Sequence, residues 1–448
     1  MTLPSSAARG AFGLLLCAAA LFGCNARRWA IDTPLPSARG SADALPASPR
    51  GDELETWASS SESPRPAPPG LGLPGCGRPE QSLFSAAREV AQQTADHQPW
   101  DVSDVVAQVR AAGGPFVWPR AWTLEGSHLD AAELESGLTA WLERTPPIGE
   151  RRCGTAQVKG KQGGEVFAAV VVDVLADLDA LPTRARLGQW IRLRARLLTG
   201  AQYAETVLLG PRGVPRIIPS ELRPAEVRAV FNLDQPGMWR IQLLLSGDRG
   251  PRPAAEAWIF VDEEPHLAAA QRPAPGEELA ASSASVGDLR ARLLEMLNAA
   301  RRSEQRLPVH RDPRLDQLAQ AHAEAMRASR QTAHDVGQGL PPERVRRAGI
   351  HAAVIGENVA HASSLGRAHR SLWDSPAHRA TLLDPRFSAV GIGVALGDEA
   401  RVGPLSADVQ GVATNPKSPA VRTGAAPDTA VLGARGDPEV WVCELFAN

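Results

Sequence analysis

Two short strings in the last third of the chain decide the fold: Gly356-Glu357-Asn358, and Trp373-Asp374-Ser375-Pro376-Ala377-His378-Arg379. Proline at the first position of a helix has the backbone angle that the helix needs, so Pro376 predicts a short helix that carries His378. Before these strings, apolar residues recur at helical spacing over 289–300 and 315–326. After them, apolar runs at 390–396 and 440–446 predict strands. Helices followed by strands predict a layered α+β domain.

Residues 287–448 resemble the CAP superfamily of cysteine-rich secretory proteins, antigen 5 and pathogenesis-related proteins, in its short bacterial SCP-like form. Six segments carry the resemblance in the family's order: Leu293–Arg301, Leu315–Met326, His334, Arg344–Gly349 with the Gly-Glu-Asn string, Trp373–Arg379, and the two strands. The resemblance implies a three-layer α-β-α sandwich. The low-complexity stretch 398–438 interrupts this pattern, and we interpret it as a loop insertion.

The resemblance also implies a cleft lined by two histidines and one or two glutamates. Carried over by position, these residues are His334, Glu357 and His378, with Asn358, Trp373 and Arg379 as supporting residues of the motifs. Two neutral imidazoles and a carboxylate can hold zinc or another divalent cation. Such a set leaves a coordination position open for water or a ligand.

Three departures from the family pattern indicate a reduced cleft. Pro376 stands where larger members carry a second glutamate, Ala377 replaces the motif glycine, and Thr381 replaces an asparagine. Each site residue also has a structural alternative. Glu357 could brace a turn through backbone N–H groups, His378 could cap its helix, and His334 could be a loop residue. His322 lies on the apolar face of its helix and is interpreted as a core histidine.

The N-terminus has the features of an export signal. Ala11–Phe22 is a short apolar run after Arg9, too short to span a bilayer. It ends in Leu21-Phe22-Gly23-Cys24, which resembles the lipobox of bacterial lipoproteins, so 1–23 is the predicted signal peptide and Cys24 the predicted lipidation site. An ordinary secretory signal is the alternative. Both kinds of signal place the protein in the cell envelope or outside the cell. The Pro/Ser-rich stretch 24–74 predicts a disordered tether.

Residues 75–175 predict a helical α+β domain, which could be a degenerate copy of the CAP-like region. Leu83-x-x-Ala-Ala-x-x-x-Ala91 parallels Leu315-x-x-Leu-Ala-x-x-x-Ala323, and Val109–Gly113 parallels Val345–Gly349. No Gly-Glu-Asn or His-Arg string occurs there, so such a copy would lack the site. In an oxidising compartment Cys76 and Cys153 could form a disulfide, and the alternative is two buried free thiols.

Residues 176–265 predict an all-β domain, because several short runs alternate apolar and polar residues between Gly/Pro turns. In the clearest run, Ile191, Leu193 and Ala195 alternate with Arg192, Arg194 and Arg196. The pattern favours an immunoglobulin-like β-sandwich. Residues 266–286, rich in Ala, Pro and Ser, predict a linker to the CAP-like domain.

Composition and missing motifs limit the function. The 448-residue chain has 48 Lys and Arg against 50 Asp and Glu, a net charge of −2, which excludes a generally basic nucleic-acid binder. The sequence contains no G-x-S-x-G elbow, no H-E-x-x-H string and no P-loop.

These features favour an extracytoplasmic, lipid-anchored CAP-domain protein that binds rather than catalyses. The His/Glu cleft would take an envelope protein, an extracellular protein or a glycan, with a divalent cation as the bridging group. A metal-assisted hydrolase of peptide or cell-wall material is one alternative, with Glu357 as metal ligand or general base. A lipid or sterol carrier is another, and this function would need a separate apolar groove.

Overall fold

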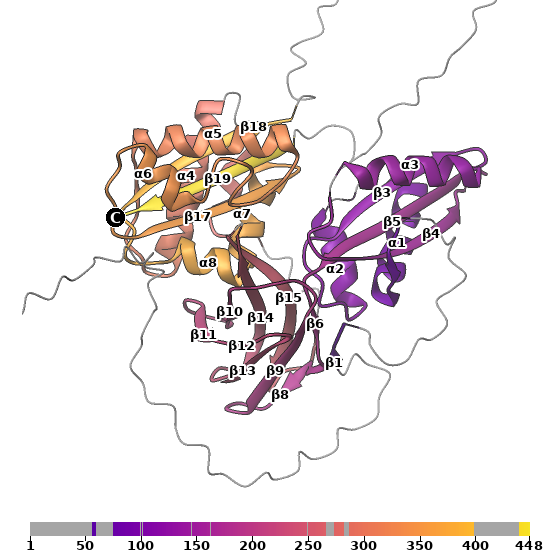
Figure 1. Ribbon diagram of the computed structural model, residues 1–448, viewed down its shortest axis with the longest axis horizontal. Helices are drawn as coiled ribbons and strands as arrows, with labels where there is room; N and C mark the ends of the chain where they lie inside the picture. The colour runs from indigo at the N-terminus through magenta and orange to yellow at the C-terminus, as the bar shows by residue number, and fades with distance from the viewer. Residues whose placement is uncertain are drawn as a thin grey trace, which may run out of the picture. The chain divides into compact units, whose positions relative to one another are not determined.

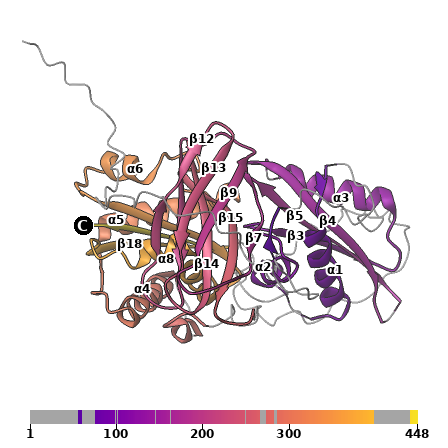
Figure 2. The ribbon, with the colours of Figure 1, turned by 90° about the horizontal axis from the view of Figure 1, so that it is seen from below.

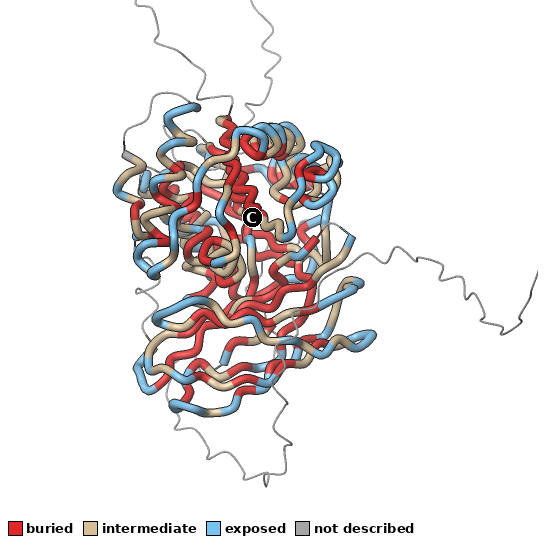
Figure 3. The backbone as a smooth tube through the Cα atoms, turned by 90° about the vertical axis from the view of Figure 1, so that its left-hand side faces the viewer, coloured by how far each residue is buried: buried red, intermediate tan, exposed pale blue. Residues whose placement is uncertain are grey.

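The computed structural model describes residues 56–59, 75–98, 100, 102–144, 146–161, 163–248, 250–265, 273–281, 286–397 and 439–448. Within these ranges the protein has mixed α/β structure, and its buried residues collect along the strands (Figure 3). No helix in these ranges is long and apolar enough to cross a membrane. Cys24, the predicted signal peptide and the predicted insertion lie outside the described residues.

The first region forms one sheet with helices on both faces (Figures 1 and 2). Its elements are β2 (Arg78–Pro79), α1 (Gln81–Ala95), α2 (Val102–Ala111), β3 (Arg120–Gly126), α3 (Ala131–Glu143), β4 (Glu150–Lys159) and β5 (Glu165–Val174). The strand order is β2-β4-β5-β3. Alternate residues of a strand point to opposite faces. Val166 and Val170 of β5 therefore pack with α1 and α2, whereas Phe167 and Val171 pack with α3.

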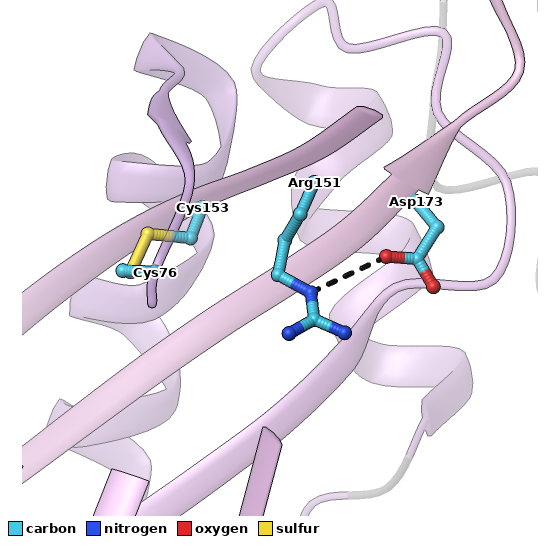
Figure 4. The surroundings of a disulfide bond; sticks show 4 residues. All are labelled: Cys76, Arg151, Cys153 and Asp173. Carbon is cyan, nitrogen blue, oxygen red and sulfur yellow. Dashed lines mark hydrogen bonds and ion pairs between the residues drawn. A yellow bond between two sulfur atoms is a disulfide. The ribbon is translucent and has the colours of Figure 1, made fainter. Parts of the chain in front are cut away.

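Cys76 and Cys153 form a disulfide that ties the segment before β2 to β4 (Figure 4). The two Cα atoms are 5.7 Å apart, and the bond links residues separated by 77 positions. Nearby, Arg151 of β4 forms an ion pair with Asp173 of β5, with Nε 3.5 Å from Oδ1. Closing a loop of this length restricts the unfolded chain and so stabilises the folded region.

The middle region consists of two sheets packed face to face around one apolar core. Its elements are β6 (Ala176–Leu178), β7 (Leu181–Pro182), β8 (Arg184–Ala185), β9 (Trp190–Leu197), β10 (Tyr203–Leu209), β11 (Arg216–Pro219), β12 (Glu221–Arg223), β13 (Glu226–Asn232), β14 (Gly237–Gly247) and β15 (Gly250–Val261). One sheet has the order β12-β13-β9-β6, and the other has the order β11-β10-β14-β15-β8. The strand β8 runs parallel to β15. The predicted alternation along β9 is present, because Ile191 and Leu193 are buried and Arg192 and Arg194 are exposed.

Part of the predicted tether belongs to the packed structure. Thr56–Trp57 form strand β1, which pairs with β7, and Trp57 is fully buried in the sandwich core. The prediction of a disordered tether over 24–74 is therefore wrong at these residues. A tryptophan buries roughly 150–250 Å² of mostly apolar surface, which suffices to hold a short segment against a sheet.

The predicted linker 266–286 is likewise partly packed. Within it, Ala274 is buried, and the short 3₁₀ helix η2 (Glu277–Ala281) carries Glu277, which forms an ion pair with Arg370. This part of the segment therefore belongs to the C-terminal region. The composition that suggested a linker did not reveal these contacts, because they are made with residues distant in sequence.

The C-terminal region is again a sheet between two layers of helices (Figure 1). Its elements are α4 (Val286–Ser303), β16 (His310–Arg311), α5 (Pro313–Ser329), α6 (Pro341–Arg347), β17 (Ile355–Ala362), α7 (Leu365–Asp374), α8 (Pro376–Leu382), β18 (Ala389–Leu396) and β19 (Val440–Ala447). Apolar side chains of α4, α7 and α8 pack on one face of the sheet, and those of α5 and α6 pack on the other. This is the three-layer arrangement that the sequence resemblance implies.

The first and last regions have the same topology. The sheet orders are β2-β4-β5-β3 and β16-β18-β19-β17, and the strands follow one another along the chain in a comparable alternation with helices. In each region the first strand is parallel to its neighbour and the other pairs are antiparallel. The residue just before the helix that follows the first strand also makes the same contact in both regions. The N–H of Glu80 donates to the carbonyl of Cys153 at 3.0 Å, and that of Asp312 to the carbonyl of Val390 at 3.0 Å.

In each of these sheets a glycine allows a helix, α1 or α5, to approach the strand closely. A Cβ at Gly154 of β4 would lie 2.0 Å from the backbone nitrogen of Phe84 in α1. A Cβ at Gly391 of β18 would lie 2.1 Å from the carbonyl carbon of Leu315 in α5. Both glycines come one residue after the strand residue that accepts the hydrogen bond described above. The two regions thus share register as well as topology.

Candidate functional site

The carboxylate of Glu357, on β17, lies at the centre of a buried hydrogen-bonded cluster. Its Oε1 accepts a hydrogen bond from Nδ1 of His334 at 3.0 Å. Its Oε2 accepts from Nη2 of Arg344 at 2.5 Å and from the thiol of Cys443, on β19, at 3.4 Å. Only 7% of Glu357 is exposed, so both oxygens obtain their partners from the protein.

These contacts keep Glu357 ionised. Burial on its own raises the pKa of a carboxyl group. The hydrogen bond from His334, together with the charges of His334, Arg344 and His322, lowers the pKa by more, so the pKa of Glu357 lies below its ordinary value. Glu357 is therefore a carboxylate at neutral pH, and the guanidinium of Arg344 balances its charge.

Arg344 fixes the loop that carries His334. Besides its bond to Glu357, Nη2 donates to the carbonyl of His334 at 3.2 Å, and Nε donates to the carbonyl of Gly339 at 3.1 Å. The planar guanidinium can make these bonds at once because its donors form a rigid fork. Sequence reasoning assigned no role to Arg344. The available signal was its place beside Val345 on the buried side of α6, where an arginine needs an acidic partner.

His322, on α5, is fully buried, as predicted for a core histidine, but its ring belongs to the same cluster. Its Nε2 lies 3.0 Å from the carbonyl oxygen of Ala333 and 3.8 Å from Oε1 of Glu357. Its Nδ1 lies 3.1 Å from Oε1 of Gln338. The ring therefore packs against the buried side of the Glu357 carboxylate and supports the loop that carries His334.

His378 lies in the first turn of α8, as Pro376 predicts. The side chain of Asn358 donates to the carbonyl of His378 at 3.2 Å and so attaches α8 to β17. Desolvation, and the charge of the nearby His334, lower the pKa of His378 to about 3. Its ring thus stays neutral at physiological pH. In the described part of the chain, neither ring nitrogen of His378 has a hydrogen-bond partner, so a lone pair remains available.

Asn358 and Glu444 form a second buried polar contact, which sequence reasoning missed. They face each other on β17 and β19, and Nδ2 of Asn358 donates to Oε2 of Glu444 at 3.2 Å. Both residues are fully buried, and Oδ1 of Asn358 and Oε1 of Glu444 have no partner among the described residues. Desolvation raises the pKa of Glu444 to about 7, although the bond from Asn358 opposes this shift.

We expect replacement of Glu444 by glutamine to stabilise the protein at alkaline pH. Because the pKa of Glu444 is raised on folding, the folded protein holds a proton that the unfolded chain has lost, and stability falls as pH rises from about 4 to 7. The difference between the ordinary value of 4.5 and about 7 corresponds to roughly 3 kcal/mol. Urea unfolding of Glu444→Gln should show this gain at pH 8 and almost none at pH 4.

The matched control is Glu324→Gln, which removes an exposed carboxylate from α5. The free energy of unfolding of this variant should equal that of the wild type at every pH, within about 0.5 kcal/mol. Equal pH dependence in Glu444→Gln and the wild type would show that Glu444 does not titrate between these values.

Trp373 and Arg379, the remaining motif residues, brace the junction of α7 and α8. The guanidinium carbon of Arg379 lies 3.7 Å from the centroid of the Trp373 ring, and its Nε donates to the Trp373 carbonyl at 2.6 Å. Desolvation, with the charge of Arg240, lowers the pKa of Arg379 to about 10. The motif thus keeps α8, and with it His378, in place.

The donor atoms fit a two-imidazole metal site better than a site with Glu357 as a ligand. His378 offers a neutral ring without partners, and the bond from Nδ1 of His334 to Glu357 leaves Nε2 of His334 as its free nitrogen. Both oxygens of Glu357 are already bonded. Among the described residues, no group of three or more His, Cys, Asp and Glu side chains is arranged to hold a metal ion.

A sheet between two helical layers, with a histidine-flanked buried glutamate on its outer strand, defines the class of domain to which this region belongs. Residues 294–405 match the model of the cysteine-rich secretory protein family, called CAP. The C-terminal region is therefore a CAP domain, as the sequence motifs predict.

The chain is also similar to several solved structures at low identity. An outer surface protein from Borrelia burgdorferi is 13% identical, with 37% of this chain and 97% of that chain covered and a TM-score of 0.27. An extracellular SCP-domain protein from Bacillus anthracis is 13% identical, with 61% and 86% covered and a TM-score of 0.25. A cysteine-rich secretory protein from Staphylococcus aureus is 10% identical, with 61% and 85% covered and a TM-score of 0.23. No curated protein matches the chain.

Proposed function

We propose that this protein works outside the cytoplasm as a binding protein, and that its CAP domain holds a divalent cation between His334 and His378 to capture a ligand. The observation that carries the proposal is the neutral, unpartnered ring of His378 near His334. Imidazole nitrogens with a free lone pair suit zinc, which supplies open coordination positions for a ligand when it is bound.

In this proposal Glu357 orients His334 instead of binding the metal. Its Oε1 accepts from Nδ1 of His334, so the other ring nitrogen keeps its lone pair for the cation. Carboxylate–histidine pairs of this kind are common behind metal ligands and raise the basicity of the ligating nitrogen. Arg344 and Cys443 occupy the second oxygen, which favours a supporting role for the whole Glu357 cluster.

The same contacts weigh against the hydrolase alternative. A general base needs an oxygen that is free to take a proton and a pKa near the working pH. Glu357 has partners on both oxygens, and its pKa lies below the ordinary value, which makes it a weak base. Binding without catalysis is therefore the better-supported function, and lipid or sterol carriage remains an outcome that the following experiment separates.

Calorimetric titration of the purified protein with zinc tests the proposal. We expect a Kd of about 1 µM or tighter for the wild type, and loss of binding in both His334→Ala and His378→Ala, because each substitution removes one of the two imidazoles that would hold the cation. His351→Ala removes an exposed histidine and should bind as the wild type does. Zinc binding that survives both site substitutions would overturn the proposal. A lipid carrier would bind its ligand equally well in all three variants.

We also propose lipid anchoring at Cys24, which would place the cleft near a membrane. The lipobox-like string supports the anchor. The disulfide between Cys76 and Cys153 supports an oxidising compartment, since such bonds seldom persist in the cytosol.

The shared topology supports a further proposal, that the first region is a second CAP-like unit without the site. If Gly154 corresponds to Gly391, strand pairing places Ala121 at the position of Glu357 and Trp122 at that of Asn358. An experimental structure tests this correspondence, and a strand order other than β2-β4-β5-β3 would contradict it.

For the middle region we propose an immunoglobulin-like sandwich. Taken in chain order, β6, β9, β12 and β13 form one sheet, and β10, β14 and β15 lie in the other. This arrangement corresponds to the four-strand and three-strand sheets of that fold. Such a domain could act as a spacer or as an adhesion module.

A further inference from the structure

The outer surface of one sheet of the sandwich carries a row of cations beside an exposed aromatic ring. Along β9, Ile191, Leu193 and Ala195 point into the core, so Trp190, Arg192, Arg194 and Arg196 point outward. On the adjacent strand β13, Arg228 and Val230 point outward as well. We call Trp190, Arg192, Arg194, Arg228 and Val230 the β9 face.

The β9 face has more positive charge than the fold needs. Arg194 lies directly opposite Arg228 in the register of the two strands, and like charges in that position destabilise a sheet. Glu226 pairs with Arg228 at 2.6 Å, and Asp177 pairs with Arg196. Among the described residues, Arg192 and Arg194 have no close ion pair, and the charge of Arg194 acts only at longer range on Glu226, whose carboxylate is already paired with Arg228. Two exposed guanidinium groups are therefore available to bind an anion.

The apolar part of the β9 face lies at one end of this row. Trp190 is 60% exposed and Val230 is 54% exposed. Trp190 pairs with Asn232, and Val230 pairs with Arg192, so the two apolar side chains are diagonal neighbours on the same surface. An exposed tryptophan beside a second exposed apolar residue is a common feature of binding surfaces, because the flat indole ring gains from being covered.

We propose that the β9 face binds an anionic polysaccharide. The indole of Trp190 provides a flat surface for the apolar face of a sugar ring. Arg192 and Arg194 provide forked donors that match the geometry of carboxylate, sulfate or phosphate groups. From Trp190 to Arg194 the strand spans about 13 Å at roughly 3.3 Å per residue, a length suited to two or three linked sugars.

A nucleic acid could also use an aromatic ring and arginines, but other features favour the polysaccharide. The chain as a whole has a net charge of −2, whereas non-specific nucleic-acid binding rests on an extended basic surface. The disulfide also points to an oxidising compartment outside the cytoplasm. This site is separate from the proposed metal site, so each can fail without the other.

The test is the affinity of the purified full chain for polygalacturonate, measured by calorimetry in low salt. We expect Trp190→Ala and the double variant Arg192→Ser/Arg194→Ser each to weaken binding by about tenfold or more, since stacking and charge-assisted hydrogen bonds both contribute. Binding should also weaken in about 0.5 M NaCl because salt screens exposed charges. Dextran, which is uncharged, should bind much more weakly than polygalacturonate.

The matched control is Arg186→Ser/Arg212→Ser, which removes the same charge from exposed positions elsewhere on the sandwich. This variant should bind polygalacturonate like the wild type. No binding by the wild type, or equal loss in the control, would overturn the proposal. The protein could instead bind single-stranded DNA more tightly than polygalacturonate and lose that binding in the same site variants. This result would overturn the polysaccharide proposal in favour of a nucleic-acid surface.

Discussion

Alanine at Gly391 or at Gly154 is expected to destabilise its region by about 4 kcal/mol or more, beyond the usual range for one added methyl group. The added Cβ would lie 2.1 Å from the carbonyl carbon of Leu315 in the first case and 2.0 Å from the backbone nitrogen of Phe84 in the second. Because these neighbours are backbone atoms, no side-chain rotation relieves the overlap. The whole helix, α5 or α1, must move away from its sheet.

Urea unfolding, combined with limited proteolysis to identify the affected region, measures this effect. We expect Gly391→Ala to expose the CAP domain to protease and Gly154→Ala to expose the first region. Gly200→Ala is the control, since a Cβ there meets nothing within 4 Å. A loss of less than about 1 kcal/mol in either site variant would mean that the helix does not approach the strand as closely as the structure indicates.

Removal of the Glu357 carboxylate is expected to cost about 3–5 kcal/mol, as breaking a buried ion pair usually does. In Glu357→Ala, the buried guanidinium of Arg344 loses its counter-charge, and Nδ1 of His334 loses its acceptor. In Glu357→Gln the shape is kept but the charge is lost, so we expect an intermediate loss. The loss in Glu357→Ala should appear at pH 7 and shrink at low pH, because the lowered pKa means that Glu357 stabilises the fold only while it is ionised.

The double variant Glu357→Leu/Arg344→Met serves as the control for the ion pair. It removes both charges, so it should recover a large part of the stability that Glu357→Ala loses. A double variant as unstable as Glu357→Ala would show that the cost comes from packing and not from an unpaired charge. In the zinc titration, Glu357→Gln should weaken binding by about 10–100-fold without abolishing it if Glu357 acts behind His334.

Local sequence was sufficient for the parts of the fold that depend on neighbouring residues. Alternation along β9 predicted its buried and exposed faces, and Pro376 predicted the short helix α8, whose first turn carries His378. The motifs around Glu357 and His378 predicted the CAP domain. These signals are local because propensity, capping and periodicity act over a few residues.

Other features depended on residues far apart in the sequence. Trp57 was assigned to a tether because its neighbours are polar and proline-rich, yet it is buried in a core formed mainly by residues beyond position 175. Glu444 and Cys443 were interpreted only as part of a predicted strand. Their roles became visible when β19 brought them beside Asn358 and Glu357.

The sequence alone determined that the C-terminal region is a CAP domain and named His334, Glu357 and His378 as its candidate site, because motif residues and their order are written along the chain. Only the tertiary structure decided the protonation and role of each side chain. The pKa of Glu357, the neutral ring of His378 and the buried proton of Glu444 are set by desolvation and by charges such as Arg344. These effects act through space over a few ångströms, between residues such as Asn358 and Glu444 that are 86 positions apart in the chain, and so no local pattern encodes them.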